Sequence, residues 1–268
     1  MTVNSKINCG GCIAKVNTDL NELLGEGNWS VDTSLPNKPL TFSDDADVDD
    51  VVAGILDDVR RRGLDAVLEY TQRFDGIELD AHSISLSSSE IDAAASAVST
   101  EERAALELAA ARIRAFHERQ IPQDQSWTDD VGTTLGWRWT AVDSAGLYVP
   151  GGLASYPSSV LMNAIPAAVA GVKRIVMSAP TPGGQINPLV VYAAQLCGID
   201  TIYRMGGAQA IGALAYGADP IACVDKITGP GNAYVAAAKR RVFGHVGIDM
   251  IAGPSEVLII ADETANPM

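Results

Sequence analysis

Histidine and cysteine, the side chains that most often bind zinc, are scarce in this sequence. The 268 residues hold three histidines and four cysteines. The three histidines do not stand at a zinc-like spacing from the pair Cys9 and Cys12. We therefore assign no metal ligand in this chain and interpret Cys9 and Cys12 as part of a flexible leader, with a redox or metal role as the alternative. Cys197 and Cys223 lie in apolar stretches, so we expect reduced core residues.

Long hydrophobic runs and a targeting signal are also missing. No apolar run reaches the roughly eighteen residues that a helix needs to cross a bilayer. Residues 1–6 lack the basic head and apolar core of a secretory signal. Hydrophobic residues nevertheless make up 47% of the chain, enough to build a buried core in two α/β lobes or in one large one. We therefore expect a soluble, globular, cytoplasmic protein with no membrane partner.

Basic side chains are outnumbered. The chain carries 33 acidic and 19 basic residues, which gives a formal net charge of −14. A protein of this sign repels phosphate backbones at long range. We therefore expect no nucleic acid among its partners.

The N-terminal part of the chain reads as an arm followed by helices. Residues 1–40 carry Gly, Asn, Ser and Pro without sustained periodicity, which indicates a loosely ordered arm that packs on a partner subunit. Apolar residues from 48 to 59 recur on one helical face, and Gly63 follows as a stop signal. The acidic run before this helix suits the positive end of a helix dipole. It does not fit a calcium loop, because Asp50 and Leu56 stand where that loop needs Gly and Glu.

Two further helices and a connector follow. Capping boxes begin the helices, and we expect the apolar stripe of the second helix to pack on the core. Residues 120–143 hold three tryptophans among polar residues and indicate an irregular or antiparallel connector. We expect the tryptophans to cover the core, with stacking on a base as the alternative. The capping boxes are Ser87 with Glu90 and Ser99 with Glu102, the stripe is Leu106, Ala109, Ile113 and Phe116, and the tryptophans are Trp127, Trp137 and Trp139.

One local pattern occurs four times between Gly146 and Pro254: a short apolar strand, a glycine-bearing turn and a helix. This alternation predicts crossover connections and a mostly parallel sheet. The turns of such a sheet meet at its carboxyl edge, where helix N–H groups can bind a nucleotide-sized ligand. The expected strands are 147–149, 174–178, 201–204, 224–227 and 257–261, and the expected helices are 158–170, 188–197, 208–216 and 232–243.

Three polar residues near these turns are candidates for ligand contact. Asn232 opens a helix after a Gly-Pro-Gly turn, where it can either cap the helix or bind the ligand. Tyr234 replaces the third glycine of the usual dinucleotide fingerprint. Gln209 stands where a capping Ser or Asp is commoner, which favours ligand contact. Ser255 has no histidine near it in the sequence, so we expect binding and not nucleophilic catalysis.

Six motifs of the chain resemble those of histidinol dehydrogenase, in order and at fitting spacing. The resemblance covers about residues 48–267, and the last three motifs together are highly specific. The motifs are Phe74-Asp75-Gly76, Phe116 to Gln120, Gly146 to Gly152, Gly206 to Ile211, Asp225 to Tyr234 and Ile248 to Glu256.

The resemblance implies two Rossmann-like lobes with mostly parallel sheets. It also implies a zinc-dependent enzyme that oxidises L-histidinol to L-histidine through an enclosed aldehyde, uses two NAD molecules and forms an intertwined homodimer. Carried over by motif, Tyr148, Gln209 and Asn232 contact NAD, and Ser255 contacts the substrate. The family's zinc ligands and its proton-handling Glu-His pair follow these motifs, beyond Met268. We therefore expect no catalytic residue and no zinc ligand in this chain, an incomplete first lobe, and no histidinol-dependent reduction of NAD.

The expected organisation has four parts. They are an arm at 1–40, a first α/β lobe at 41–143, a Rossmann-like NAD-binding lobe at 144–256, and a strand within 257–268 that returns to the first lobe. We expect the isolated chain to associate, because an incomplete lobe exposes apolar edges. Two alternatives are a non-catalytic nucleotide-binding module and a related zinc and NAD alcohol dehydrogenase acting on sulfonated diols.

Overall fold

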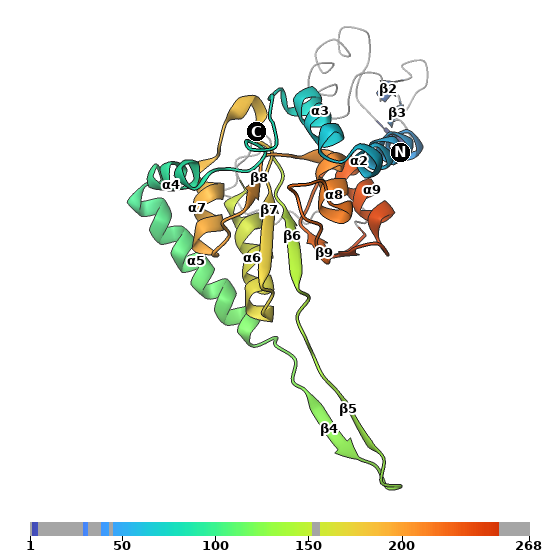
Figure 1. The fold of residues 1–268 in the computed structure, drawn as a ribbon, viewed down its shortest axis with the longest axis vertical. Coiled ribbons are helices and arrows are strands. Elements are labelled where there is room, and N and C mark those ends of the chain that lie inside the picture. Colours follow the sequence, from blue (N-terminus) through green and yellow to red (C-terminus); the bar gives the residue numbers. More distant parts are fainter. Residues whose placement is uncertain (1, 5–28, 32–38, 43–44, 152–155, 252–268) are drawn as a thin grey trace.

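A five-stranded parallel sheet is the centre of the fold (Figure 1). The computed structural model describes residues 2–4, 29–31, 39–42, 45–151 and 156–251. The strands of the sheet are β6 (Ser144–Tyr148), β7 (Arg174–Ser178), β8 (Ile202–Tyr203), β9 (Lys226–Thr228) and β10 (Gly247–Ile248). The α/β class with a parallel sheet, predicted from the sequence, is confirmed.

The order of the strands reverses direction once. The sheet runs β10-β9-β6-β7-β8, so the chain starts in the middle at β6, moves outward to β7 and β8, and returns to the other side of β6. Gly146 in β6 pairs with Val176 on one side and Ile227 on the other. Ligands of open α/β sheets bind beyond the carboxyl ends of the strands where the order reverses. Here that point is the end of β6.

Helices α6 (Pro157–Ala170) and α7 (Pro188–Leu196) cover one face of the sheet, and a short 3-10 turn, η1 (Pro182–Gly184), precedes α7. Helices α4 (Ser88–Ser96) and α5 (Thr100–Glu118) pack outside them, as Figure 1 shows. Apolar side chains of strands β6, β7 and β8 and of helices α6 and α7 fill the space between, and this burial stabilises the face. They include Leu147, Leu161, Ile165, Met177, Val191 and Ile202.

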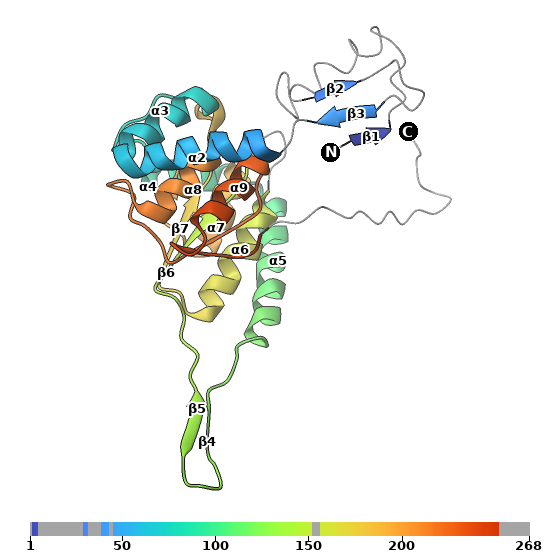
Figure 2. The ribbon, with the colours of Figure 1, turned by 90° about the vertical axis from the view of Figure 1, so that its right-hand side faces the viewer.

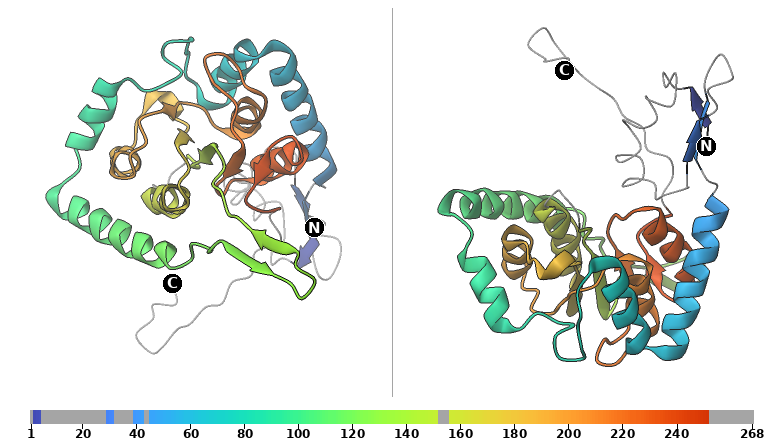
Figure 3. Two further views of the ribbon diagram at one scale, coloured as in Figure 1. Left: turned by 60° about the horizontal axis from the view of Figure 1, so that its bottom comes forward. Right: turned by 90° about the horizontal axis from the view of Figure 1, so that it is seen from above.

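The other face carries α8 (Gly207–Tyr216) and α9 (Ala233–Val242), with α2 (Asp45–Arg62) and α3 (Leu64–Asp75) outside them (Figure 3). The predicted stop at Gly63 is confirmed, since this residue has φ +60 between α2 and α3. The acidic run overlaps the first turns of α2, and Asp49 there pairs with Arg240 and Arg241 of α9. Fully buried side chains on this face include Val52, Val59, Ile211, Leu214 and Ile227.

The predicted elements and the observed ones agree closely between β6 and α9. The strand at 174–178 is found as predicted, and the bounds of the four helices differ by one residue at most at each end. Strand β9 begins two residues later than expected, and β10 was not predicted. The strand predicted at 257–261 lies outside the described residues.

The two capping boxes are confirmed, but the prediction that the apolar stripe of α5 packs on the core is confirmed only in part. In each box the serine hydroxyl accepts from the N–H of the glutamate, and the glutamate carboxylate accepts from the N–H of the serine. Leu106, Ala109 and Ile113 are partly buried against the core. Phe116 is 61% exposed. As an outer helix, α5 packs with one face only, and its C-terminal end reaches past α7 toward the hairpin described next.

The connector forms an antiparallel hairpin, as predicted, of β4 (Gln125–Thr128) and β5 (Thr134–Trp137). It extends away from the body of the molecule (Figures 1 and 2). Trp127 and Trp137 pack edge to face with ring centroids 5.3 Å apart, yet both stay exposed, as does Trp139. The expectation that these tryptophans cover the core is therefore wrong. Because the hairpin leads into β6, it lies at the amino edge of the sheet, opposite the carboxyl edge.

The N-terminal interval contains a small antiparallel sheet. Its order is β1-β3-β2, with β1 (Thr2–Asn4), β2 (Trp29–Val31) and β3 (Pro39–Phe42). Strands β1 and β2 fall inside the interval that the sequence indicates as an arm. Cys9 and Cys12 lie outside the described residues.

The two described cysteines are free, as expected, but only one is near the core. Cys197 is partly buried, and burial raises the pKa of its thiol to about 11, so it stays protonated. Cys223 is exposed, which contradicts its assignment to the core. It follows the turn after α8, where the chain reaches the surface before β9.

Candidate functional site

A cavity of about 860 Å³ lies at the carboxyl edge of the sheet, at the end of β6. Its wall combines the turns after β6, β7, β8 and β9 with residues of α2 and α3. The sequence-predicted residues Tyr148, Gln209 and Asn232 all line it. Tyr148 and Asn232 are more than eighty positions apart in the sequence, and the fold brings them to one cavity together with Gln209.

Tyr148 ends β6 and is almost fully buried. Its hydroxyl accepts a hydrogen bond from the N–H of Gly207, with an N–O distance of 3.0 Å. Burial raises the pKa of this hydroxyl, and the negative charge of Asp75 adds to the effect, while the Gly207 N–H opposes it. The hydroxyl therefore stays neutral and keeps its hydrogen for an acceptor on a ligand.

Gln209 lies in the first turn of α8 and is 1% exposed. Neither its amide nitrogen nor its amide oxygen has a hydrogen-bond partner within the described residues. Leaving a buried polar group unpaired costs about 1–3 kcal/mol. Gly206 is the N-cap residue of this helix, so Gln209 lies three residues after the cap and does not itself cap the helix. A buried, unpaired amide on a cavity wall is able to pair with a group that supplies both a donor and an acceptor.

Asn232 caps α9. Its side-chain oxygen accepts from the N–H of Val235, with an N–O distance of 3.1 Å. Of the two roles left open by the sequence, the capping role is therefore present. The cap uses only the oxygen, and the amide nitrogen of this exposed side chain remains a donor for a ligand in the cavity.

The turn that carries Asn232 is fixed by an ion pair between a buried lysine and a partly exposed aspartate. Lys239 of α9 pairs with Asp249 and donates to the carbonyl of Gly229 at 2.9 Å. The N–H of Gly229 donates to Asp249 at 2.9 Å. Burial acts to raise the pKa of Asp249, but the hydrogen bonds from Lys239, Gly229 and Met250 outweigh it and lower the pKa. This pair holds the turn between α9 and the end of β10.

The sequence pattern did not identify Lys239 and Asp249. A signal was present: Lys239 stands four residues after Val235 and three before Val242, both fully buried, so a lysine falls on the apolar face of α9. A cation at such a position needs a buried partner.

Pro180 joins the turns after β6 and β8. A Cβ added at Gly206 would lie 2.8 Å from the Cβ of Pro180, and one added at Gly151 would lie 2.5 Å from its Cγ. The hydroxyl of Ser178 also donates to the carbonyl of Met205 at 2.7 Å. Both glycines are therefore required by the close approach of the turns.

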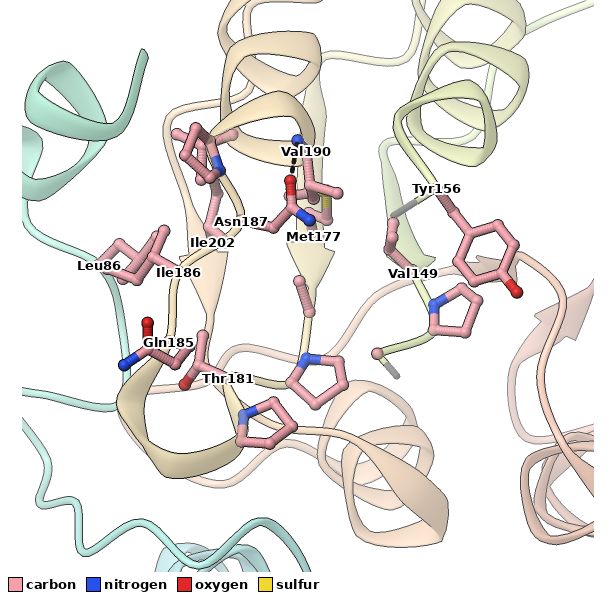
Figure 4. A pocket seen from close by; sticks show the side chains of 17 residues that line it. Leu86, Val149, Tyr156, Met177, Thr181, Gln185, Ile186, Asn187, Val190 and Ile202 are labelled. Carbon is pink, nitrogen blue, oxygen red and sulfur yellow. Dashed lines mark hydrogen bonds between the residues drawn. The ribbon is translucent and has the colours of Figure 1, made fainter. Parts of the chain in front are cut away.

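A second cavity, of about 330 Å³, adjoins the first on the side of β7 and β8 (Figure 4). The two share Pro150, Gly151, Pro180 and Pro182. Apolar side chains dominate its wall, and Asn187 caps α7 there by accepting from Val190. The labelled apolar side chains in Figure 4 are Leu86, Val149, Met177, Ile186, Val190 and Ile202.

Asp75 lines the larger cavity from the side of α3. Its Oδ2 atom is buried and has no hydrogen-bond partner within the described residues. Burial raises the pKa of this carboxyl group. The sequence motif Phe74-Asp75-Gly76 includes this residue but does not by itself indicate a role for the aspartate.

Ser255, the predicted substrate contact, lies outside the described residues. Within the part of the chain that the structure describes, no three His, Cys, Asp or Glu side chains stand together as a metal site would require. No zinc-dependent step is therefore derived from these residues.

The fold and the cavity define a Rossmann-like α/β protein with a cavity at the point where its strand order reverses. The family model described as histidinol dehydrogenase matches residues 40–268. The chain belongs to the histidinol dehydrogenase family, whose members are oxidoreductases.

Relatives and a solved structure agree with this membership. The histidinol dehydrogenase of Ruegeria pomeroyi is 69% identical over 224 residues, which cover 84% of this chain and 52% of that protein. That of Cereibacter sphaeroides is 66% identical, with the same coverage. A crystal structure of histidinol dehydrogenase from Elizabethkingia anophelis superposes with a TM-score of 0.75 at 42% identity, covering 82% of this chain and 51% of that one. The chain spans about half the length of the curated relatives that it matches.

Proposed function

We propose that this chain carries the NAD-binding part of a histidinol dehydrogenase, which oxidises L-histidinol to L-histidine. The observation that carries the proposal is the buried, unpaired amide of Gln209 on the same cavity wall as Tyr148 and Asn232. NAD, when bound, accepts a hydride from the alcohol carbon of the substrate. The proposal includes the lobe at 144–256 as the unit that binds the dinucleotide, and Ser255 as a substrate contact.

The chemistry of the cavity fits a dinucleotide. Gln209 can donate to and accept from an amide or a hydroxyl group, Tyr148 can donate, and Asn232 can donate through its nitrogen. The adjoining cavity has an apolar wall that suits an aromatic base. Together these residues would orient a dinucleotide along the carboxyl edge, with its polar groups at the end of β6.

Exchanging Gln209 for leucine tests the proposal. Gln209→Leu keeps the volume and removes two unpaired polar atoms, so we expect the free protein to unfold at a higher temperature. We expect NAD to bind at least about tenfold more weakly, because one or two hydrogen bonds to the ligand are lost. Isothermal titration calorimetry with NAD, together with thermal unfolding, measures both effects.

Gln195→Leu is the matched control. Gln195 is an exposed glutamine on α7 that donates to Asp92 at 3.3 Å, away from the cavity. The affinity for NAD should not change in this variant. A wild-type chain that fails to bind NAD, or a Gln209→Leu variant that binds it as tightly as the wild type, contradicts the proposal.

The relatives favour histidinol over the other substrates considered. Those reported above are all named histidinol dehydrogenase, and none of those names refers to sulfonated diols. Zinc belongs to the proposal for the whole enzyme only. The described residues offer it no ligand set, so its site is not assigned to them.

We also propose a homodimer, in which the β4–β5 hairpin packs on a second copy of the chain. A two-stranded hairpin is at best marginally stable alone. This one carries Trp127, Leu135 and Trp137 with 44–47% of their surface exposed. We expect Leu135→Glu to shift the chain toward the monomer, because a charge would be buried against the partner. Size-exclusion chromatography with light scattering measures the mass.

Thr134→Glu is the control for this prediction. Thr134 precedes Leu135 on the same strand, so its side chain lies on the opposite face of the hairpin. This variant should remain dimeric. A wild-type chain that is monomeric at all concentrations contradicts the homodimer, and equal effects of the two variants contradict the packing of this face.

We place the protein in the cytoplasm, in keeping with a biosynthetic oxidoreductase family. Separately, the described part of the chain contains no helix of the length and apolarity needed to span a membrane.

A further inference from the structure

We propose that Asp75 is a binding residue of the dinucleotide site and accepts hydrogen bonds from the hydroxyl groups of a ribose. The inference rests on the proposed NAD site and adds to it a residue that the motif comparison did not assign. Asp75 and Gln209 are two cavity-lining residues with a buried polar atom that lacks a partner within the described chain. They reach the cavity from different elements, α3 and α8.

The end of α3 places this carboxylate. Asp75 is the last residue of the helix, and Gly76 follows with φ +63 as its cap, donating its N–H to the carbonyl of Gln72. The chain turns away at Gly76, which leaves the side chain of Asp75 on the cavity wall. Tyr148, at the end of β6, lines the same cavity.

The hydrogen-bonding chemistry of the carboxylate indicates which part of the dinucleotide contacts Asp75. An ionised carboxylate only accepts hydrogen bonds, and the buried Oδ2 atom of Asp75 needs a donor. In a dinucleotide, the phosphates are acceptors with negative charge, whereas the ribose hydroxyls and the amino groups of the adenine and of the nicotinamide amide are donors. Acidic residues bind ribose hydroxyls in other sheets of this class. On this ground we assign the ribose, and not an amino group, as the partner of Asp75.

A calorimetric titration with NAD tests the inference on wild type, Asp75→Asn and Asp75→Ala. The asparagine keeps the shape but loses the charge that strengthens the hydrogen bonds. We expect NAD to bind about tenfold more weakly to Asp75→Asn and more weakly still to Asp75→Ala. Competition by AMP and by nicotinamide mononucleotide, each with one ribose, should weaken in Asp75→Asn for at least one of them.

Asp65→Asn is the matched control. Asp65 is an exposed aspartate on the same helix, α3, and does not line the cavity, so its replacement removes one negative charge without removing a buried acceptor. The affinity of this variant for NAD should stay within about twofold of the wild-type affinity.

A second readout is thermal unfolding without NAD. Asp75→Asn should be at least as stable as wild type, because it removes the negative charge of a partly buried carboxylate whose Oδ2 atom is unpaired.

The outcomes separate the inference from the proposed function. A wild-type chain that does not bind NAD refutes the NAD site itself. If the wild type binds NAD and both Asp75 variants bind it equally well, the ribose contact is refuted. It is refuted too if Asp75→Asn is less stable than wild type, or if it loses affinity for L-histidinol alone while NAD binding is unchanged.

Discussion

Replacing Gly229 with alanine should lower the free energy of unfolding by about 3 kcal/mol or more and weaken NAD binding. Gly229 has φ +122, a conformation that residues with a side chain rarely adopt. A Cβ there would overlap the carbonyl oxygen of Tyr148 and lie 3.0 Å from its carbonyl carbon. These are backbone atoms that cannot rotate away. The turn would have to shift and would displace Tyr148 and Asn232 together. Urea denaturation and calorimetry with NAD measure the two effects.

Gly244→Ala separates packing from backbone strain. Gly244 has φ +98, but an added Cβ would meet no described atom within 4 Å. We expect a loss of about 1 kcal/mol from the backbone alone and no change in NAD affinity. If both alanine variants are destabilised equally, the close approach to Tyr148 is not the cause of the effect at Gly229.

Replacing Lys239 with methionine should destabilise the chain by about 1–3 kcal/mol, less than the cost for a fully buried ion pair because Asp249 is partly exposed to water. Only 8% of the Lys239 side chain and 30% of the Asp249 side chain are exposed. The variant leaves Asp249 without its cation and the carbonyl of Gly229 without its donor. Adding Asp249→Asn should recover part of the lost stability, since it removes the unpaired charge. Urea denaturation of the single and double variants measures the coupling.

The same pair makes stability depend on acid pH. The folded pKa of Asp249 is lowered, so its contribution is complete above the unfolded pKa of about 3.9 and is lost as the pH falls through the folded pKa. In Lys239→Met the burial of Asp249 remains while the cation is gone, so we expect its pKa to rise. The variant should then differ most from wild type near neutral pH, and the difference should shrink below about pH 4.

Arg240→Met is the control for Lys239. Arg240 is the next residue of α9 and pairs with Asp49 at 3.2 Å, with 49% of its side chain exposed. We expect a change below about 1 kcal/mol, as for most surface pairs. A loss equal to that of Lys239→Met would show that any cation on α9 has the same effect.

The sequence predicted the fold of the second half of the chain because its signals are local. Alternating apolar strands and helices, glycine turns and capping boxes each act within a few residues, and they define the elements from β6 to α9. The parallel order follows from the crossovers. The common location of Tyr148, Gln209 and Asn232 follows from the same logic, since turns after parallel strands meet at one edge.

What the sequence did not predict depends on distant contacts. Asp75 and Val51 line the cavity only because α2 and α3 pack on α8, and no local pattern specifies that packing. The pairing of Lys239 with Asp249 joins two elements in the same way. The prediction that Trp127 and Trp137 cover the core is wrong for a related reason. Aromatic side chains favour burial, but their presence in the sequence does not say whether they are buried within their own chain or against another molecule.

The contacts around Pro180 have a consequence for the entropy of ligand association. Gly206 and Gly151 both rest on this proline ring, and Ser178 ties the turn at Met205 to the end of β7. Three segments of the rim thus hold one another in place before any molecule enters. A preorganised rim loses little conformational freedom on association, so more of the contact energy is expressed as affinity.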